Sequence, residues 1–104
     1  AFYVAYDTKE HSAVGIIGLR PLKERVCEMK RFYIKPEYRG RGYGDVLVTF
    51  IMSEAKDMGY GSMVLDSDKA LVTAIKLYTK HGFVECEDYN GNINPNVVYM
   101  SCDL

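Results

Sequence analysis

The first third of the chain alternates between short apolar stretches and polar breaks, as strands joined by turns do. Residues 2–6 and 12–22 are rich in β-branched and aromatic side chains, and the polar residues 7–11 separate them. Val26–Ile34 mixes apolar and charged residues without a helical period, and Pro36 closes the stretch. This pattern predicts a hairpin followed by a third strand.

The middle of the chain changes to a helical period directly after three glycines. Gly40, Gly42 and Gly44 stand two residues apart, and Gly59 and Gly61 mark the point where the following helix should stop. Six apolar residues between these two glycine groups fall at helical spacing: Val46, Leu47, Phe50, Ile51, Ala55 and Met58. The predicted order is therefore strand, glycine-rich loop and helix.

The last third predicts one more helix between short strands. Residues 62–66 form a short apolar run, and Ser67 or Asp68 is expected to cap a helix that Gly82 ends. Four residues of that helix should share one face: Leu71, Ala74, Ile75 and Tyr78. Residues 83–86 and 97–102 read as strands, with a turn over residues 90–96. The whole, residues 1–104, is expected to be a single α/β domain with a β-α-β-α-β centre.

Composition and charge narrow the range of partners. The chain of 104 residues carries 13 basic and 14 acidic side chains, a net charge of −1, so no overall field attracts nucleic acid or an anionic membrane. Cys27, Cys86 and Cys102 lie inside apolar runs without metal-ligand spacing, which indicates reduced core residues and no metal site. Reduced cysteines are typical of a cytoplasmic protein, and a nuclear one fits equally. No apolar run approaches the roughly 20 residues that cross a bilayer, and no basic leader opens the chain.

The glycine-rich loop has the properties of a local anion site. A helix N-terminus presents unbonded N–H groups, and the glycines allow the amides of residues 41–45 to converge on a pyrophosphate. Arg39 and Arg41 add positive charge at the rim. The loop lacks the Gly-Lys-Ser/Thr of a P-loop and the third glycine position of a dinucleotide turn. From these residues alone, a glycine-rich connection with two solvated arginines remains an equal interpretation.

Three blocks in order resemble the GNAT acetyltransferases. Arg39, Gly42 and Gly44 match the Arg/Gln-x-x-Gly-x-Gly/Ala signature of that family. Residues 27–36 resemble the strand before the signature, including its proline, and residues 74–83 resemble the helix end Ala-Ile-x-Leu-Tyr-x-Lys-x-Gly-Phe. The resemblance spans roughly residues 27–86. It implies the acyl-CoA N-acyltransferase fold, a mixed and mostly antiparallel central sheet with flanking helices, and acetyl-CoA as cosubstrate.

The same resemblance assigns the residues that would hold the cofactor. The third strand should splay from its neighbour so that pantetheine pairs with the backbone of Phe32, Tyr33 and Ile34. The pyrophosphate should lie on the loop, made of Arg39, Gly40, Arg41, Gly42, Tyr43, Gly44 and Asp45. Two departures stand out: the family's usual first strand and helices are missing here, which implies a shortened N-terminus or an open acceptor side, and Leu71 replaces an Asn that many members carry.

Two side chains are candidates for catalysis. Tyr78 matches a family tyrosine beside the cofactor sulfur and would protonate the departing thiolate, although packing alone would also explain it. Glu28 would serve as general base, or bind the acceptor ammonium, if burial raises its pKa from about 4.3. An ion pair with Lys30 or Arg31 on a solvated face is the alternative for Glu28. His81 is interpreted as a solvated residue at a helix C-terminus, and exposure is the default for Lys80.

The resulting expectation is an N-acetyltransferase that moves acetyl from acetyl-CoA to a primary amine by direct attack in a ternary complex. The alternative is a non-catalytic module that binds CoA or acyl-CoA for regulation. The acceptor is expected to be a small-molecule or peptide amine, with no nucleic acid or membrane partner. Asp88, Tyr89 and Asn90 could line its pocket or only form a turn. A homodimer would fit an open acceptor side.

Overall fold

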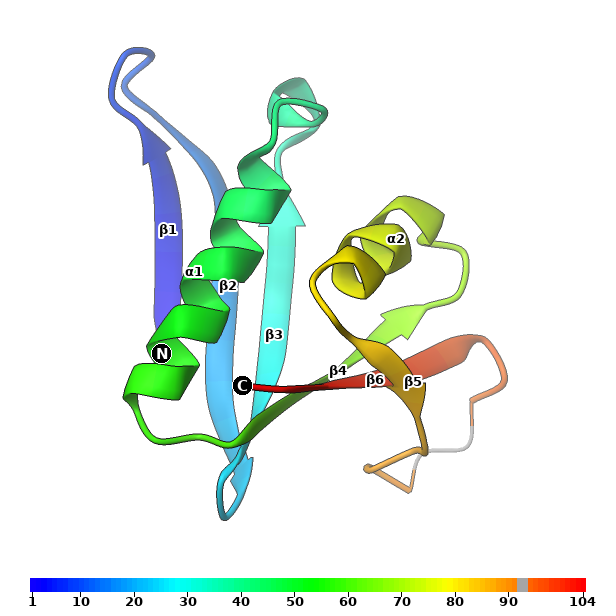
Figure 1. Cartoon of the computed structure of the whole chain (residues 1–104). Helices are drawn as coiled ribbons and strands as arrows, with labels where there is room; N and C mark the ends of the chain where they lie inside the picture. Colours follow the sequence, from blue (N-terminus) through cyan, green and yellow to red (C-terminus); the bar gives the residue numbers. More distant parts are fainter. Residues whose placement is uncertain (92–93) are drawn as a thin grey trace.

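A six-stranded mixed sheet with two helices on one face forms the protein. The computed structural model describes residues 1–91 and 94–104. The elements in chain order are β1 (Phe2–Asp7), β2 (Ser12–Lys23), β3 (Val26–Ile34), the 3-10 turn η1 (Pro36–Tyr38), α1 (Tyr43–Asp57), β4 (Ser62–Asp68), α2 (Val72–Lys80), β5 (Val84–Cys86) and β6 (Val97–Asp103). The strand order is β1-β2-β3-β4-β6-β5, and β3 with β4 is the one parallel pair among the described strands (Figure 1). The predicted mixed, mostly antiparallel sheet with a β-α-β-α-β centre is confirmed.

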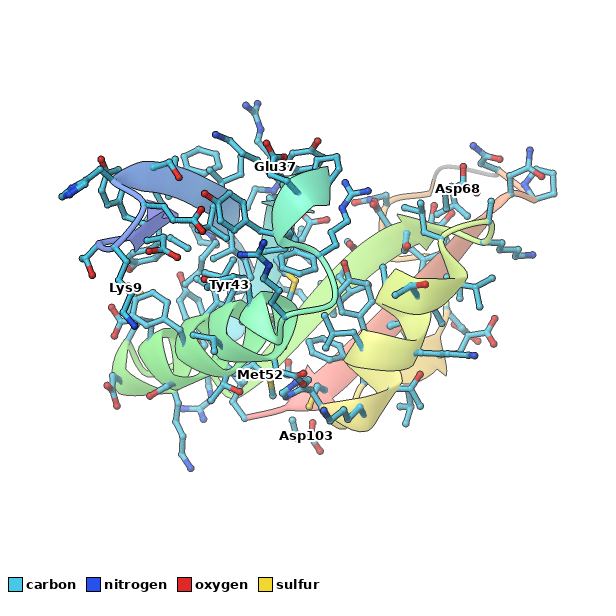
Figure 2. All side chains as sticks on the ribbon, turned by 90° about the horizontal axis from the view of Figure 1, so that it is seen from above. Lys9, Glu37, Tyr43, Met52, Asp68 and Asp103 are labelled. Carbon is cyan, nitrogen blue, oxygen red and sulfur yellow. The ribbon has the colours of Figure 1, made fainter. Side chains whose placement is uncertain are left out.

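Both helices cover the same face of the sheet, and their apolar stripes fill the space beneath them (Figures 1 and 2). The buried residues of α1 are Leu47, Val48, Ile51 and Ala55. Of the six residues predicted at helical spacing, Val46, Phe50 and Met58 are instead exposed. A helix that packs on a sheet buries only one stripe of its surface, so residues at the margins of that stripe stay exposed to solvent. Phe50 still packs edge to face on Tyr3 of β1, with ring centroids 4.8 Å apart.

The start of α2 differs from the prediction. Ser67 and Asp68 do not cap the helix, because β4 continues through both of them in its ladder with β6. The Asp68 carboxylate instead accepts the Ala70 N–H at 2.8 Å, and Leu71 is the residue before the helix. Leu71 is exposed and does not share the predicted buried face. The ladder between β4 and β6 therefore decides the conformation of Ser67 and Asp68, against their local preference for a helix cap.

The other predicted boundaries hold, with glycines at both helix ends. Gly59 follows α1 with φ 93° and Gly82 follows α2 with φ 96°, values in the left-handed region that favours glycine. Cys27 and Cys102 are buried and Cys86 is half-buried, all three as free thiols. Part of the predicted turn over residues 90–96 lies outside the described residues, namely 92 and 93. Neither described helix is long and apolar enough to cross a membrane.

Candidate active site

The functional cleft opens where β3 and β4 stop pairing. Their parallel ladder runs only from Val26–Ser62 to Glu28–Val64, and beyond it the strands diverge (Figure 1). A cavity of about 640 Å³ occupies the divergence, with β2 and β3 on one side and β4 and α2 on the other. The predicted splay of β3 from its neighbour is therefore present, and it begins directly after Glu28.

A bulge in β3 lies at the mouth of this cleft. Lys30 pairs with Gly18 and Tyr33 pairs with Ile16, so β3 has two residues, 31 and 32, against one in β2. Arg31 adopts φ 51°, which is unusual for a residue other than glycine. Bulges bend a strand and redirect its side chains, and they are frequent beside active sites. Here the bulge leaves residues 31 and 32 outside the β2–β3 ladder.

The edge of β3 that faces the cleft carries peptide groups without a strand partner. Lys35 N–H donates to the Val14 carbonyl at 2.9 Å. Because hydrogen-bonded and non-hydrogen-bonded pairs alternate in an antiparallel ladder, Tyr33 directs its peptide groups to β2, and Ile34 directs its own to the cleft. Arg39 Nε already donates to the Ile34 carbonyl at 2.9 Å. The Ile34 N–H and the bulge are thus the parts of this edge open to a ligand.

The glycine-rich loop presents a set of unbonded amides at the start of α1. Gly40 and Gly42 have φ values of 76° and 86°, and no side chain caps the helix at Gly42. Within the described residues, no backbone N–H from 40 to 45 donates a backbone or side-chain hydrogen bond, and the first to do so is Val46, to Gly42 O at 3.3 Å. The predicted amide cup, residues 40–45, therefore has free donors, and its binding of a diphosphate stays a prediction.

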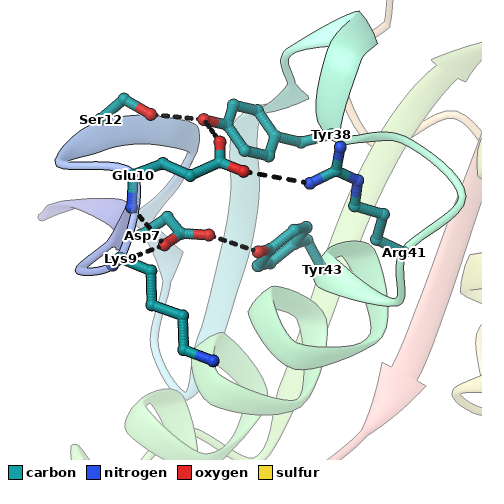
Figure 3. A network of polar contacts seen from close by, with 7 residues as sticks. All are labelled: Asp7, Lys9, Glu10, Ser12, Tyr38, Arg41 and Tyr43. Carbon is teal, nitrogen blue, oxygen red and sulfur yellow. Dashed lines mark hydrogen bonds and ion pairs between the residues drawn. The ribbon is translucent and has the colours of Figure 1, made fainter.

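The β1–β2 turn supports this loop from outside through a polar network (Figure 3). Tyr43 OH donates to Asp7 at 3.0 Å, and Tyr38 OH donates to Glu10 at 2.5 Å. Arg41 lies 3.7 Å from the same Glu10 carboxylate and stacks 5.2 Å above the Tyr38 ring. The Arg41 side chain remains 52% exposed, so it keeps contact with the solvent at the rim.

Asp45 ties the start of α1 to the end of α2. Its carboxylate accepts hydrogen bonds from Lys80 Nζ and His81 Nε2, each at 2.8 Å. The bond from Lys80 and then that from His81 lower the pKa of Asp45. The interpretation of His81 as a solvated residue is wrong, because its side chain is 17% exposed and bonds to Asp45. Lys80 is exposed as predicted, but it lies beside the amide cup.

Tyr78 stands in an aromatic row and also borders the cleft. Its ring packs edge to face against Phe32 and Phe83, with centroids 6.1 and 6.0 Å away. The Tyr78 hydroxyl has no hydrogen-bond partner in the described part of the chain. Every fully buried side-chain polar atom in that part has a partner, so this hydroxyl is not fully buried. It faces the cavity that Tyr78 lines. Burial first, and the charge of Asp66 second, raise the pKa of Tyr78 to about 12. The residue therefore both packs and offers a protonated hydroxyl.

Glu28 is fully buried, and three donors surround it. Arg20 Nε lies 2.6 Å from one oxygen, while Tyr89 OH at 2.5 Å and Lys30 Nζ at 3.4 Å approach the other. Burial works to raise its pKa, but the hydrogen bonds and the two cations outweigh it, and the pKa of Glu28 is lowered. The expected rise is therefore wrong. The ion pair with Lys30 exists, but in the interior and not on a solvated face.

Two residues at the cleft were not singled out from the sequence. Arg20 contacts Glu28 across the β2–β3 ladder, which only the register reveals. Asp66 is an exposed acid on β4 that lines the cavity. The available signal for Asp66 was an acid directly after the apolar run Met63, Val64 and Leu65. Tyr89 does more than form a turn, because it closes onto Glu28 while Asp88 accepts the Asn90 N–H at 2.7 Å.

Comparison with known proteins identifies the family. The model of the acetyltransferase (GNAT) family matches residues 1–83. The chain belongs to the GNAT family. An uncharacterized N-acetyltransferase of Schizosaccharomyces pombe is 42% identical over 97 residues, covering 91% of this chain and 60% of the relative. One of Dictyostelium discoideum is 45% identical over 74 residues, covering 71% of this chain and 34% of the relative. This GNAT chain thus spans about a third to three fifths of these relatives.

Solved structures share the GNAT fold over almost the whole chain. A proposed acyl-CoA N-acyltransferase from Klebsiella pneumoniae superposes with a TM-score of 0.91 at 27% identity, covering 99% of this chain and 71% of that one. A GNAT acetyltransferase from Elizabethkingia anophelis with acetyl-CoA bound has a TM-score of 0.84 at 20% identity, covering 99% and 75%. The acyl-CoA N-acyltransferase fold expected from the sequence is confirmed.

Proposed function

We propose that this protein is an N-acetyltransferase that moves acetyl from acetyl-CoA to a primary amine by direct attack in a ternary complex. The observation that carries the proposal is that one strand, β3, leads from the cleft, which the unpartnered Tyr78 hydroxyl faces, along its open edge to the loop with the unbonded amides. A module that only binds CoA needs the cup and the edge. It has no need of a tyrosine hydroxyl facing the cavity.

The cofactor lies along β3, with its diphosphate at the loop. Amides of residues 40–45 donate to the diphosphate oxygens, and the α1 dipole adds to the attraction. Arg39 and Arg41 supply charge at the rim, and Lys80 is within reach if it exchanges Asp45 for phosphate. The amide-rich pantetheine arm pairs with the Ile34 N–H and the bulge at Phe32, as an added strand would. Tyr33 contributes its side chain, on which Arg39 stacks at 5.3 Å.

The reaction itself needs orientation and one proton donor. The amine nitrogen attacks the thioester carbonyl carbon, a C–N bond forms, and the C–S bond breaks as the thiolate leaves with the electron pair. The acceptor ammonium loses one proton to water before the attack, and the nitrogen loses its second proton to water once the C–N bond has formed. Tyr78 donates its hydroxyl proton, or a hydrogen bond, to the thiolate and recovers the proton from solvent. Its raised pKa keeps it protonated at neutral pH.

Glu28 is better suited to positioning than to proton abstraction. With a lowered pKa it is ionised at neutral pH and holds little affinity for a proton. Its contacts instead fix Arg20 and Lys30 at the wall of the cavity. We assign it the placing of these cations beside the acceptor, with water as the proton acceptor.

Replacing Tyr78 by Phe separates catalysis from binding. We expect Tyr78→Phe to lower kcat by about 100-fold, the usual contribution of a general acid, while the Kd for CoA changes less than about twofold. Tyr6→Phe, on the exposed side of β1, is the matched control and should leave both values unchanged. Turnover is followed by thiol release with a panel of amines, and CoA binding by calorimetry.

Three results would count against the proposal in different ways. No thermal stabilisation by millimolar CoA removes every CoA-based function, because a ligand of the folded state must raise its stability. Stabilisation by CoA without transfer to any amine supports the regulatory module. Full turnover in Tyr78→Phe removes that residue from the mechanism and leaves the enzyme standing.

A further inference from the structure

The cavity between β3 and β4 has walls of opposite charge. Arg20, Lys30 and Arg31 line it from β2 and β3, while Asp66 and Asp68 line it from β4. Side chains alternate between the two faces of a strand. Met29 and Leu65 belong to the core beneath the helices, so the neighbouring Lys30 and Asp66 belong to the opposite, helix-free face. The charged side chains thus belong to the helix-free face of the sheet, while Tyr78 of α2 and the core residues Met29 and Leu65 border the same cavity from the other face.

The register shows that these charges face each other across the opening. Glu28 is the last residue of β3 paired with β4, opposite Val64. Two residues further along the same register, Lys30 stands opposite Asp66. No ion pair joins them within the described residues, and Lys30 Nζ lies 3.4 Å from Glu28 instead. The divergence of the strands keeps two opposite charges apart, and a ligand that carries both charges can bridge them.

The anionic wall is the one beside the reacting groups. The Asp66 side chain is exposed and makes no hydrogen bond or ion pair with any described residue. Burial is the main cause of the raised pKa of Tyr78 and the charge of Asp66 is the second; for Tyr89, Asp66 adds a smaller contribution after burial and Glu28. Glu28, in contrast, is already surrounded by three donors. Asp66 is therefore the carboxylate available to an incoming ammonium.

The cationic wall holds more charge than its own partner neutralises. Arg20 binds Glu28 through Nε, yet its side chain is 54% exposed, and that of Lys30 is 36% exposed. Arg31 is exposed with its guanidinium 5.4 Å above the Phe2 ring. Arg20 and Lys30 share the single buried carboxylate of Glu28, and Arg31 has no ion pair with any described residue. A ligand carboxylate placed here meets positive charge that the protein leaves unpaired.

We propose that the acceptor is a zwitterionic amine, a free amino acid being the simplest member of the class. Asp66 receives its ammonium next to the cofactor, and Lys30 with Arg31 receives its carboxylate. The assignment rests on the proposed acetyl transfer and adds the substrate class to it. Simple amines and amino acid amides, which lack the carboxylate, are then poor acceptors.

Matched acceptors test the proposal on the whole chain. The probes are L-phenylalanine, L-phenylalaninamide and phenethylamine, and three further triplets built from leucine, methionine and lysine. We expect kcat/KM for the amino acid to exceed that for its amide by about tenfold or more in at least one triplet, the usual yield of a charge-assisted contact. Ligand-observed NMR of the same probes with CoA present measures binding without turnover.

Variants of each wall then separate its contribution. Arg31→Gln, which does not touch Glu28, and Lys30→Gln should each reduce the preference for acid over amide by about threefold or more. Asp66→Asn should lower kcat/KM about tenfold for all three members of a triplet, with the KM for acetyl-CoA unchanged. Lys76→Gln and Asp57→Asn, exposed on α2 and at the end of α1, are the controls and should alter neither value.

The outcomes keep this inference distinct from the proposed function. Transfer to amide, amine and acid at equal rates overturns the zwitterion and leaves the acetyltransferase intact. If CoA binds and no probe is acetylated, the catalytic proposal fails, and NMR decides the site: selective binding of the acids supports it, and equal or absent binding overturns it. A preference for acids that persists in both Arg31→Gln and Lys30→Gln also overturns the assignment.

Discussion

The two halves of β3 differ although they belong to one strand. Val26–Glu28 is paired with β2 on one side and β4 on the other, whereas residues 29–34 keep only β2 and carry the bulge. The paired half ends in the buried, fully bonded carboxylate of Glu28. The open half turns the Ile34 N–H away from β2, and its exposed Lys30 and Arg31 line the cavity. The cleft therefore exists because the ladder between β3 and β4 stops after Glu28. Glu28, the last paired residue, anchors the paired half of β3.

The largest expected effect comes from breaking the paired half at Glu28. Glu28→Ala removes the partner of Arg20, Tyr89 and Lys30 in one step. We expect the free energy of unfolding to fall by about 3 kcal/mol, the lower end for removing one member of a buried ion pair, because two of the partners can still reach water. Urea unfolding measures the change. Glu24→Ala, exposed in the β2–β3 turn, should stay within about 0.5 kcal/mol of the parent protein.

A loss below about 1 kcal/mol would show that Glu28 is not an anchor, and the two halves of β3 would then differ only in their ladder. Glu28→Gln refines the measurement, because it keeps the shape and removes the charge.

The second, smaller effect in the paired half of β3 is the loss of folding stability at acidic pH. A lowered pKa in the folded state means that Glu28 contributes stability above its ordinary value of 4.5, and that this contribution is lost as the pH falls through the lowered value. Glu28→Gln should therefore be less stable than the parent by about 2 kcal/mol at pH 7, with the difference closing toward zero below pH 4. Asp7 and Asp45 also have lowered pKa values, but they titrate in both proteins and cancel.

Denaturant unfolding of both proteins between pH 3 and pH 7 measures this difference. A constant gap across that range would contradict a lowered pKa for Glu28, whatever its size at neutral pH.

The sequence predicted the elements well because their signals are local. Period-two and helical patterns, together with Gly59 and Gly82 at helix ends, placed the strands and helices to within a few residues. The failures were tertiary. Asp68 is a residue type that favours helix caps, but it pairs with Val97 of β6 and so belongs to β4. Val46 and Phe50 fit the helical period, but they lie outside the stripe of α1 that packs on the sheet and stay exposed.

The candidate site divides in the same way. The unbonded amides could be predicted because glycine spacing and a helix start are visible in the residues themselves, whereas Tyr78 was a candidate only through the resemblance to GNAT acetyltransferases. The contact between Arg20 and Glu28 could not be predicted from any motif. Lys23 pairs with Val26 at the turn, which alone would place Arg20 opposite Met29, but Leu22 is an extra residue in β2 and shifts Arg20 onto Glu28. One bulge thus decides which side chains meet. The contact with Arg20 that it creates helps to lower the pKa of Glu28.

The smallest expected effect is a change in amide hydrogen exchange along the open half of β3. Amide hydrogen exchange followed by NMR should slow about tenfold at Ile34 and at residues 31 and 32 when acetyl-CoA binds, because a pantetheine partner replaces water at those groups. Cys27 and Glu28 already have neighbours on both sides and should not change. ADP is the control ligand, since it carries a diphosphate without pantetheine and should slow exchange only in the cup, residues 40–45. Protection of the cup without protection of Ile34 by acetyl-CoA would mean that the gap beside β3 serves the acceptor alone, and that the ladder stops for the amine and not for the cofactor.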